Sequence, residues 1–300
     1  AISSGERKMK MNNYSTFFRN NRRRFQTNRR NNNEPDPGNG PWLLQQYREF
    51  VAAVQFLTVV PWPGSISLFS TYDYESDPGM IIGSAYFSLV GGLLALLLCL
   101  IPLVLGTVFP PMVLAVLVLV VQILLTGGLH LDGLMDSCDG LFSGRDPERK
   151  LEIMRDSRVG SFGVLGAACI LLVKFASYAS LNVHVLPLVL LTVLPSARWA
   201  MLLAVYVFPN ARQGGLGEAF RQTLTMPRLV CAGVIALLFA LLWGHLAGLF
   251  IWAGATVISL LLGAGIVRTL GGLTGDSYGA IEEATEAGAL LLAFLFMAWF

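Results

Sequence analysis

Six long apolar stretches limit what this chain can fold into. They cover roughly residues 80–108, 111–129, 160–182, 185–207, 229–247 and 249–268. Each approaches or exceeds the roughly 20 apolar residues that an α-helix needs to cross a bilayer. Only 13% of the 300 residues are charged and the mean hydropathy is +0.61, whereas a soluble domain carries about a quarter charged residues. The sequence therefore predicts an all-α, polytopic integral membrane protein.

Two further apolar stretches are too short for a clear assignment. The stretch 287–300 has 14 residues, which is marginal for a full crossing. The stretch 50–62 is also short and ends in Pro61 and Pro63, which favours an interfacial or re-entrant helix. We predict a bundle of about seven transmembrane helices plus this short helix.

The charge is unevenly distributed along the chain. Residues 1–30 hold nine Lys or Arg and one acid, whereas residues 31–300 hold twelve basic and eighteen acidic residues. We interpret 1–42 as a basic, Asn/Arg-rich flexible tail and 43–300 as the transmembrane domain that carries the chemistry. A basic tail beside apolar helices indicates a positive-inside anchor on a lipid bilayer, so no nucleic acid is expected.

The same rule gives an orientation. The polar connections 130–160 and 208–228 carry Lys or Arg, and so does the end of the sixth stretch at Arg268. The connections near 109, 183 and 248 carry neither. We therefore expect the N-terminus and the loops 130–160 and 268–286 to lie on the cytoplasmic side of the inner membrane.

A first group of acids follows the second apolar stretch. Asp132, Asp136 and Asp139 are spaced by four and three residues, so a helix would place them within about 60° of one another. Three carboxylates this close repel one another unless they are protonated or bridged by a cation. Oxygen ligands favour Mg²⁺, or Mn²⁺, over zinc. The alternative is a solvated helix end, which the Leu, Met and Gly on the other faces argue against.

A second group lies near the C-terminus, after a glycine-rich segment at 271–275. Asp276, Glu283 and Glu286 would fall within about 80° on a helix, whereas Glu282 falls outside that arc. A helix cap and a solvated turn explain this group nearly as well as a ligand site. Because both groups are expected on the same side, they could form a two-part metal site.

Basic residues between the groups could bind phosphate. Arg155 and Arg158 are three residues apart and could clamp phosphate oxygens together, unless they belong to an exposed amphipathic helix. Lys174 and Arg198 lie inside apolar stretches, where a cation has a functional or ion-paired role facing the bundle interior. The chain has no P-loop, and its three histidines are dispersed with no HExxH pair. His130 stays a weaker candidate for a general base.

Several of these residues stand in motifs that resemble one family. The motifs are residues 127–143 (GGLHLDGLMDSCDGLFS), 151–160 (LEIMRDSRVG), 55–58 (QFLT), 215–220 (GLGEAF) and 271–276 (GGLTGD), with Lys174, Glu283 and Glu286. Together they are similar to the cobalamin synthase family, adenosylcobinamide-GDP ribazoletransferase, over roughly residues 50–300. Met135 and Ser137 stand where Ala and Thr are expected, which are mild differences.

The resemblance implies a Mg²⁺-dependent phosphotransferase in the membrane. Adenosylcobinamide-GDP and α-ribazole, or its 5′-phosphate, would give adenosylcobalamin, or its 5′-phosphate, and GMP. The oligomeric state stays open, and a homo-oligomer is possible. The resemblance also implies roles for individual residues. Catalytic residues would be Asp132, Asp136, Asp139, Asp276 and Glu283; metal ligands Asp132, Asp136, Asp139, Glu283 and Glu286; substrate contacts Arg145, Arg155, Arg158, Lys174, Arg198 and Ser157.

Two other functions use similar residues. A CDP-alcohol phosphotransferase also uses clustered aspartates, but with a different expected spacing. A cation-coupled transporter also has buried acids and a membrane lysine, placed near the midplane in broken helices. The acids here cluster at the predicted cytoplasmic ends of helices, which favours the enzyme.

Overall fold

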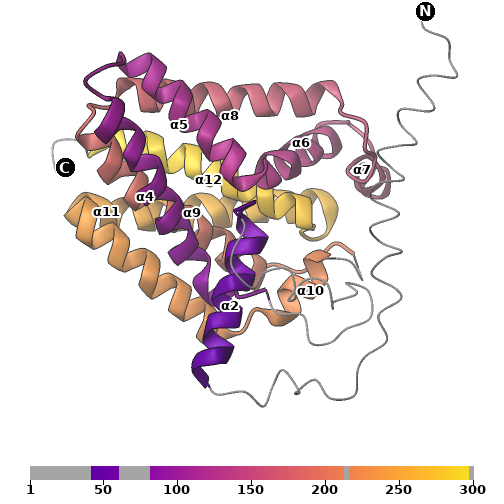
Figure 1. Cartoon of the computed structure of the whole chain (residues 1–300). Helices are drawn as coiled ribbons and strands as arrows, with labels where there is room; N and C mark the ends of the chain where they lie inside the picture. Colours follow the sequence, from indigo (N-terminus) through magenta and orange to yellow (C-terminus); the bar gives the residue numbers. More distant parts are fainter. Residues whose placement is uncertain (1–41, 61–81, 213–215, 297–300) are drawn as a thin grey trace, which may run out of the picture.

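Helices make up nearly all of the part of the chain that the computed structural model describes, residues 42–60, 82–212 and 216–296 (Figure 1). The order is α2 (Trp42–Leu57), η1 (Ser84–Tyr86), α4 (Phe87–Leu105), α5 (Pro111–Thr126), α6 (Leu129–Leu141), α7 (Pro147–Ile153), α8 (Ser161–Ser180), α9 (Val185–Val207), α10 (Leu216–Thr223), α11 (Met226–Leu270) and α12 (Gly275–Leu295). No strand occurs among these residues, so the all-α prediction is confirmed. The predicted tail lies outside the described residues apart from Trp42.

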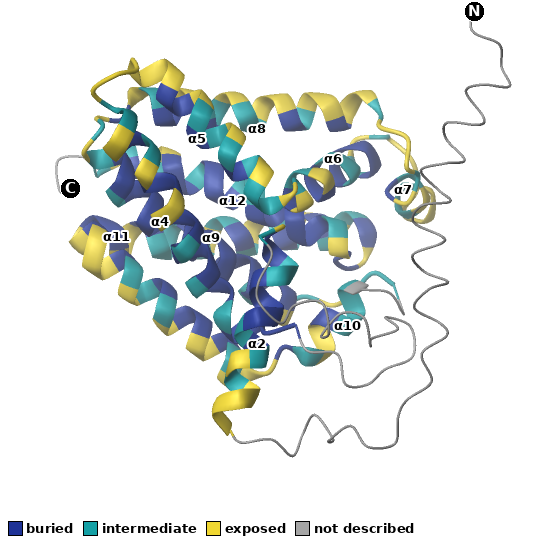
Figure 2. Cartoon of the chain, in the orientation of Figure 1, coloured by how far each residue is buried: buried dark blue, intermediate teal, exposed yellow. Residues whose placement is uncertain are grey.

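Helix α9 forms the centre of the bundle. In its most apolar window 89% of the residues are buried, compared with 28% for α8 and 33% for α11. The outer helices expose apolar side chains instead, such as Leu172 on α8 and Leu261 on α11, and Figure 2 shows exposed residues along the outer faces. Exposed leucines on helices with a buried opposite face are expected where lipid is the solvent.

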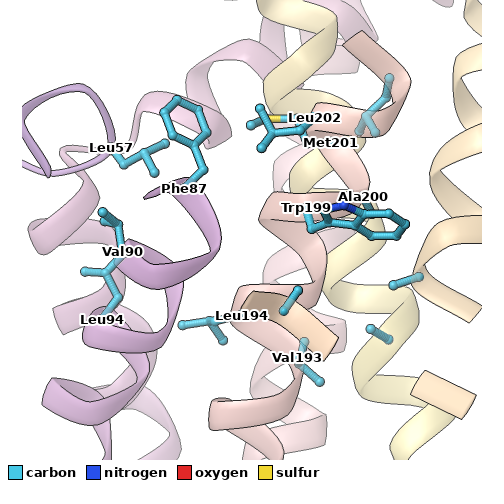
Figure 3. Packing of buried hydrophobic residues seen from close by; sticks show 14 of the residues in the cluster. Leu57, Phe87, Val90, Leu94, Val193, Leu194, Trp199, Ala200, Met201 and Leu202 are labelled. Atoms are coloured by element: carbon cyan, nitrogen blue, oxygen red, sulfur yellow. The ribbon is translucent and has the colours of Figure 1, made fainter. Parts of the chain in front are cut away.

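Helix α4 packs closely on α9 because a glycine lies at the contact. A Cβ at Gly91 would lie 3.0 Å from the carbonyl oxygen of Leu194, which leaves no room for a larger side chain. Val90 and Leu94 lie on α4 opposite Leu194, and Leu57 at the end of α2 lies beside Phe87 (Figure 3). These contacts tie the N-terminal helices to the centre.

Among the described residues, four helices are long and apolar enough to cross a membrane: Ser84–Leu105, Ser161–Ser180, Val185–Val207 and Met226–Leu270. The last has 45 residues, about 68 Å if straight, which is about twice the thickness of a hydrocarbon core. His245 breaks it with φ 49° and ψ −130°, and a Cβ at Gly248 would overlap the Ala240 carbonyl, so α11 folds back on itself. Its two limbs correspond to the predicted stretches 229–247 and 249–268.

Helices α5 and α6 form a bent pair. They meet at an angle of 89°, and the bend falls at Gly127 and Gly128, whose φ values of 62° and 69° favour glycine. Counted as one span, the pair brings the number of candidate spans to five. Beyond the bend, α6 carries Asp132, Asp136 and Asp139, so the predicted aspartate helix is confirmed.

The C-terminal helix differs from the prediction of a short span at 287–300. Helix α12 begins at Gly275 and has 21 residues, long enough to cross. Its first half was not recognised as apolar because of Glu282, Glu283 and Glu286, which the fold pairs with Lys174 and Arg198. With α12 and the second limb of α11 the count reaches seven, and this number stays a prediction. The short helix expected at 50–62 is α2, which begins earlier, at Trp42, and ends at Leu57.

Candidate active site

The site forms where α6 crosses the start of α12. A Cβ at Gly133 would lie 2.6 Å from the Asp276 carbonyl oxygen, and one at Gly279 would lie 2.8 Å from the His130 carbonyl oxygen. Two glycines on facing helices therefore let the backbones approach closely. This crossing brings the two acidic segments together although they are about 140 residues apart in sequence. In Figure 1, α6, the start of α12 and α10 lie on the same side of the bundle.

The segment before α12 is held in a fixed conformation. Thr274 and Ser277 form a capping box, in which the Ser277 N–H donates to Thr274 Oγ1 at 3.2 Å and the Thr274 N–H donates to Ser277 Oγ at 2.6 Å. Leu273 also pairs with the chain after α9, because the Ala211 N–H donates to its carbonyl at 2.8 Å. The loop at 208–212 is thereby fixed beside the start of α12.

A cavity of about 320 Å³, the first cavity, opens at this crossing. Its charged lining residues are Asp132, Arg155, Arg212, Glu218 and Asp276, together with His130. Phe56, Asn210, Gly217 and Tyr278 are among its other lining residues. Carboxylates and guanidinium groups that face one cavity can bind a metal-complexed phosphate ester.

The two arginines of the first cavity come from different segments. Arg155 follows α7, and Arg212 follows α9 and donates to the carbonyl of Leu151. Burial and the neighbouring Arg155 lower the pKa of Arg212, although it starts from the high value of a guanidinium group. Two adjacent guanidinium groups on one wall of the cavity are suited to a diphosphate.

The other two aspartates of α6 lie outside the first cavity. Asp136 is half-buried and lies close enough to Asp132 and Asp276 to interact with both electrostatically. Asp139 is buried and points to the start of α8, where its oxygens accept the Gly160 and Gly163 N–H groups at 2.7 and 2.8 Å. The geometry assigns Asp139 a helix-capping role and does not bring it to the cavity.

The remaining predicted acids and membrane cations form a buried charge network. Its members are His130, Lys174, Arg198, Glu282, Glu283 and Glu286. Lys174 Nζ lies 2.6 Å from Glu283 and 2.9 Å from Glu286, and Arg198 lies 2.8 Å from Glu282 and 3.2 Å from Glu286. The ion-paired role considered for Lys174 and Arg198 is the one found.

The network differs in two ways from the expected second half of a metal site. Glu283 and Glu286 are neutralised by cations and do not line the first cavity, so of the second acidic group only Asp276 does. Lys174 and Arg198 do not line it either, and this geometry gives them no contact with a substrate held there. Glu282, which falls outside the predicted arc, is fully buried and pairs with His130 at 3.1 Å.

Three predicted substrate contacts lie on the surface. Arg145, Ser157 and Arg158 are exposed and do not line either cavity. The Arg158 side chain is 87% exposed and pairs with Asp156, whose pKa it holds below the usual value through a side-chain hydrogen bond. Of the predicted cations, only Arg155 reaches the first cavity.

Several residues of the first cavity were missed in the sequence. Asn210 and Arg212 lie in a loop whose arginine counted only toward orientation, and Tyr278, two residues after Asp276, carries no charge that would have drawn attention to it. Tyr278 Oη donates to Asn210 Oδ1 at 2.7 Å, so it links α12 to this loop. Glu218 lay in a motif of the resemblance, which was the one signal that could have identified it.

Comparison with known proteins gives a consistent result. The family model described as cobalamin-5-phosphate synthase matches residues 49–294. The chain belongs to this family. Relatives named adenosylcobinamide-GDP ribazoletransferase include one from Desulfitobacterium hafniense (strain Y51), 42% identical over 84% of this chain and 98% of its own length, and one from Roseiflexus sp. (strain RS-1), 40% identical over 79% and 86%. No solved structure matches the chain.

The part shared with the cobalamin-5-phosphate synthase family includes every lining residue of the first cavity. Within residues 42–60, 82–212 and 216–296, no group of three or more His, Cys, Asp or Glu side chains is arranged to hold a metal ion. A Mg²⁺ ion does not need such a group, since it is usually held by one or two carboxylates and by substrate phosphates. Asp132 and Asp276, with Asp136 nearby, fit that second arrangement.

Proposed function

We propose that the chain is a membrane transferase that joins adenosylcobinamide-GDP to α-ribazole, or to its 5′-phosphate, and releases GMP. The observation that carries this proposal is the first cavity, where three carboxylates and two arginines from five segments face one space. The names of the relatives supply the substrates, and the lining supplies groups suited to a diphosphate.

Arg155 and Arg212 would bind the diphosphate of the donor. Their planar guanidinium groups can each donate two parallel hydrogen bonds to phosphate oxygens. Without them, the carboxylates of Asp132 and Asp276 would repel an anionic donor. The arginines therefore make the electrostatic interaction between the cavity and the donor attractive.

The residues fit a Mg²⁺ ion, or Mn²⁺, held by Asp132 and Asp276 together with the substrate phosphates. When bound, it would supply charge neutralisation to the diphosphate as the leaving group forms. The expectation that Asp139, Glu283 and Glu286 also ligate the metal is not part of this proposal, because their oxygens are used by α8 and by the buried cations.

In the reaction, the acceptor's ribose hydroxyl oxygen attacks the phosphorus on the cobinamide side of the diphosphate. A new P–O bond forms as the bond to the bridging oxygen breaks, and GMP leaves with that oxygen. The hydroxyl proton passes to a carboxylate at the cavity, Asp132 or Asp276. The arginines hold the donor while the negative charge moves to GMP.

We place the protein in the inner membrane with the first cavity on the cytoplasmic side. This orientation follows from the basic connection that contains α7, which contributes Arg155, and from the arginines of the loop at 208–228. A transporter would share the buried charge network, but Lys174, Arg198 and the glutamates of this network line neither cavity. The position of these charges therefore favours an enzyme over a transporter.

The test is release of GMP by the purified full-length protein in lipid nanodiscs. We expect GMP and the joined corrinoid in equal amounts from adenosylcobinamide-GDP and α-ribazole with Mg²⁺, and none after chelation by EDTA. No product with either Mg²⁺ or Mn²⁺ would contradict the function. Turnover that EDTA leaves unchanged would contradict only the metal dependence. CDP-diacylglycerol in place of the donor should give no CMP.

A further inference from the structure

A second cavity lies on the other side of Asp132. It has a volume of about 520 Å³ and lies between the end of α2 and the bend from α5 to α6. Its lining consists of Gln55, Phe56, Thr58, Val59, Thr126, Gly127, Gly128, Leu129, Leu131, Asp132 and Met135. Asp132, Phe56 and Leu129 line both cavities, so the two spaces meet at one carboxylate.

The two cavities differ in charge. The first is lined by Arg155 and Arg212, whereas Asp132 is the one charged residue among the described residues that line the second. A diphosphate has no counter-charge in the second cavity and would face a carboxylate there. The donor's diphosphate therefore belongs to the first cavity, and the second is suited to a group without negative charge.

The lining of the second cavity also indicates the shape of its occupant. Phe56, Val59, Leu131 and Met135 form an apolar surface, and an aromatic ring and a thioether pack well against a flat aromatic base. A corrin ring system is too large for this volume, but a base with one sugar is of the right size.

Polar groups are few and lie where a sugar would need them. The buried Oε1 of Gln55 has no hydrogen-bond partner among the described residues, and it can accept a hydrogen bond from a hydroxyl group. Thr58 and Thr126 instead donate to the carbonyls of Val54 and Gln122, so their hydroxyl protons are already used. The Gln55 Oε1 and the Asp132 carboxylate are acceptors for sugar hydroxyls, and neither threonine has a proton left to compete as a donor.

We propose that the second cavity holds the acceptor nucleoside, with its apolar aromatic base against Phe56 and Met135 and its ribose hydroxyl at Asp132. This inference rests on the proposed function, since it assigns the acceptor of that reaction. The donor and the acceptor then approach from opposite sides of Asp132. The dimethylated benzimidazole of α-ribazole is an apolar base of the required kind.

The test fills the second cavity and measures each substrate separately. Met135→Trp and Val59→Trp, which lie on different segments, should each raise the KM for α-ribazole about 10-fold or more. The KM for adenosylcobinamide-GDP should change less than about 2-fold. Since α-ribazole 5′-phosphate has the same base, its KM should rise in parallel. Leu165→Trp, on an exposed face of α8, is the matched control.

A second measurement does not depend on turnover. Equilibrium dialysis of α-ribazole against the wild-type protein without donor should show binding that both cavity-filling variants weaken and Leu165→Trp does not. A rise in the donor KM instead would mean that the cavity holds part of the corrinoid and would overturn the proposal, as would unchanged values for both substrates. If the wild-type protein releases no GMP yet binds α-ribazole at this cavity, the proposed reaction fails and the site assignment stands.

Discussion

Two neighbouring regions of the helical core treat charge in opposite ways. In the buried charge network, two cations and His130 face three glutamates at distances between 2.6 and 3.2 Å. At the first cavity, Asp132 and Asp276 face an open space, and Arg155 and Arg212 lie on its wall. His130 belongs to both regions, since it lines the cavity and contacts Glu282.

The difference shows how one helix can serve two purposes. Burying a charge costs several kcal/mol, which only close partners can offset, so the glutamates on α12 must be paired to remain inside the bundle. Asp276 lies at the start of the same helix, where the cavity reaches it. The paired charges fix α12 against α8 and α9, and this packing holds Asp276 opposite α6. One region supplies rigidity, and the other supplies charged groups that face an open space and are available for chemistry.

The largest effect on the rate of GMP release is expected at the first cavity. Asp132→Asn removes the carboxylate at the border of both cavities, and GMP release should fall about 10⁴-fold, equivalent to about 5.4 kcal/mol of transition-state stabilisation. The unfolding temperature should stay near that of the wild type, since Asp132 is exposed and forms no ion pair with any residue that the structure describes. Asp156→Asn in the surface loop is the control. If the Asp132→Asn protein kept the wild-type rate, the first cavity would not be the site of the reaction.

Substitutions in the buried charge network should lower the free energy of unfolding. Lys174→Met leaves Glu283 and Glu286 without their lysine, and breaking a buried pair in this way costs about 3–5 kcal/mol. Chemical denaturation in detergent, followed by tryptophan fluorescence, measures the loss. Lys150→Met on the surface helix α7 should change stability by less than about 1 kcal/mol. If Lys174→Met folds normally but loses donor binding, Lys174 contacts substrate and the distinction between the regions fails.

The sequence predicted the helices well because their signal is local. A run of apolar residues and the spacing of Asp132, Asp136 and Asp139 depend only on neighbours along the chain, and both predictions hold in the structure. The start of α12 was placed too late along the chain because its glutamates lower the local hydropathy. Only the fold shows that these glutamates meet Lys174 and Arg198.

The site was predicted in part for the same reason. Asp132, Asp276 and Arg155 were selected by residue type and spacing, and the structure brings them to one cavity. Spacing could not show that Asp139 turns to α8 on the same helix, because that depends on where Gly160 lies. Nor could it select Arg212, whose position follows from the pairing of Ala211 with Leu273.

Arg155 lines the first cavity and Arg158 lies on the surface, so substituting each in turn shows which position binds phosphate. Arg155→Gln should raise the KM for the donor about 10- to 100-fold, since a hydrogen bond to a charged group contributes about 1.5–3 kcal/mol. Arg158, three residues later and 87% exposed, should have little effect when changed to Gln. Initial rates at varied donor concentration measure both. Equal effects of the two substitutions would mean that the phosphate lies on the surface, as the original clamp interpretation of the two arginines requires.

The smallest effect is expected at Asp139, which lies on the aspartate helix but belongs to neither region. Its two oxygens accept the N–H groups of Gly160 and Gly163, so Asp139→Asn replaces one acceptor oxygen with an NH2 group, which cannot accept a hydrogen bond. The loss of a helix cap costs about 0.5–2 kcal/mol, and α8 should become easier to unfold by that amount. Because Asp139 lines neither cavity, GMP release at saturating substrate should change less than about 3-fold. A metal ligand would behave in the opposite way, with unchanged stability, a large loss of rate and a raised Mg²⁺ requirement. Measuring stability and the Mg²⁺ dependence on the same preparation therefore decides whether the third aspartate of the motif caps a helix or binds the ion.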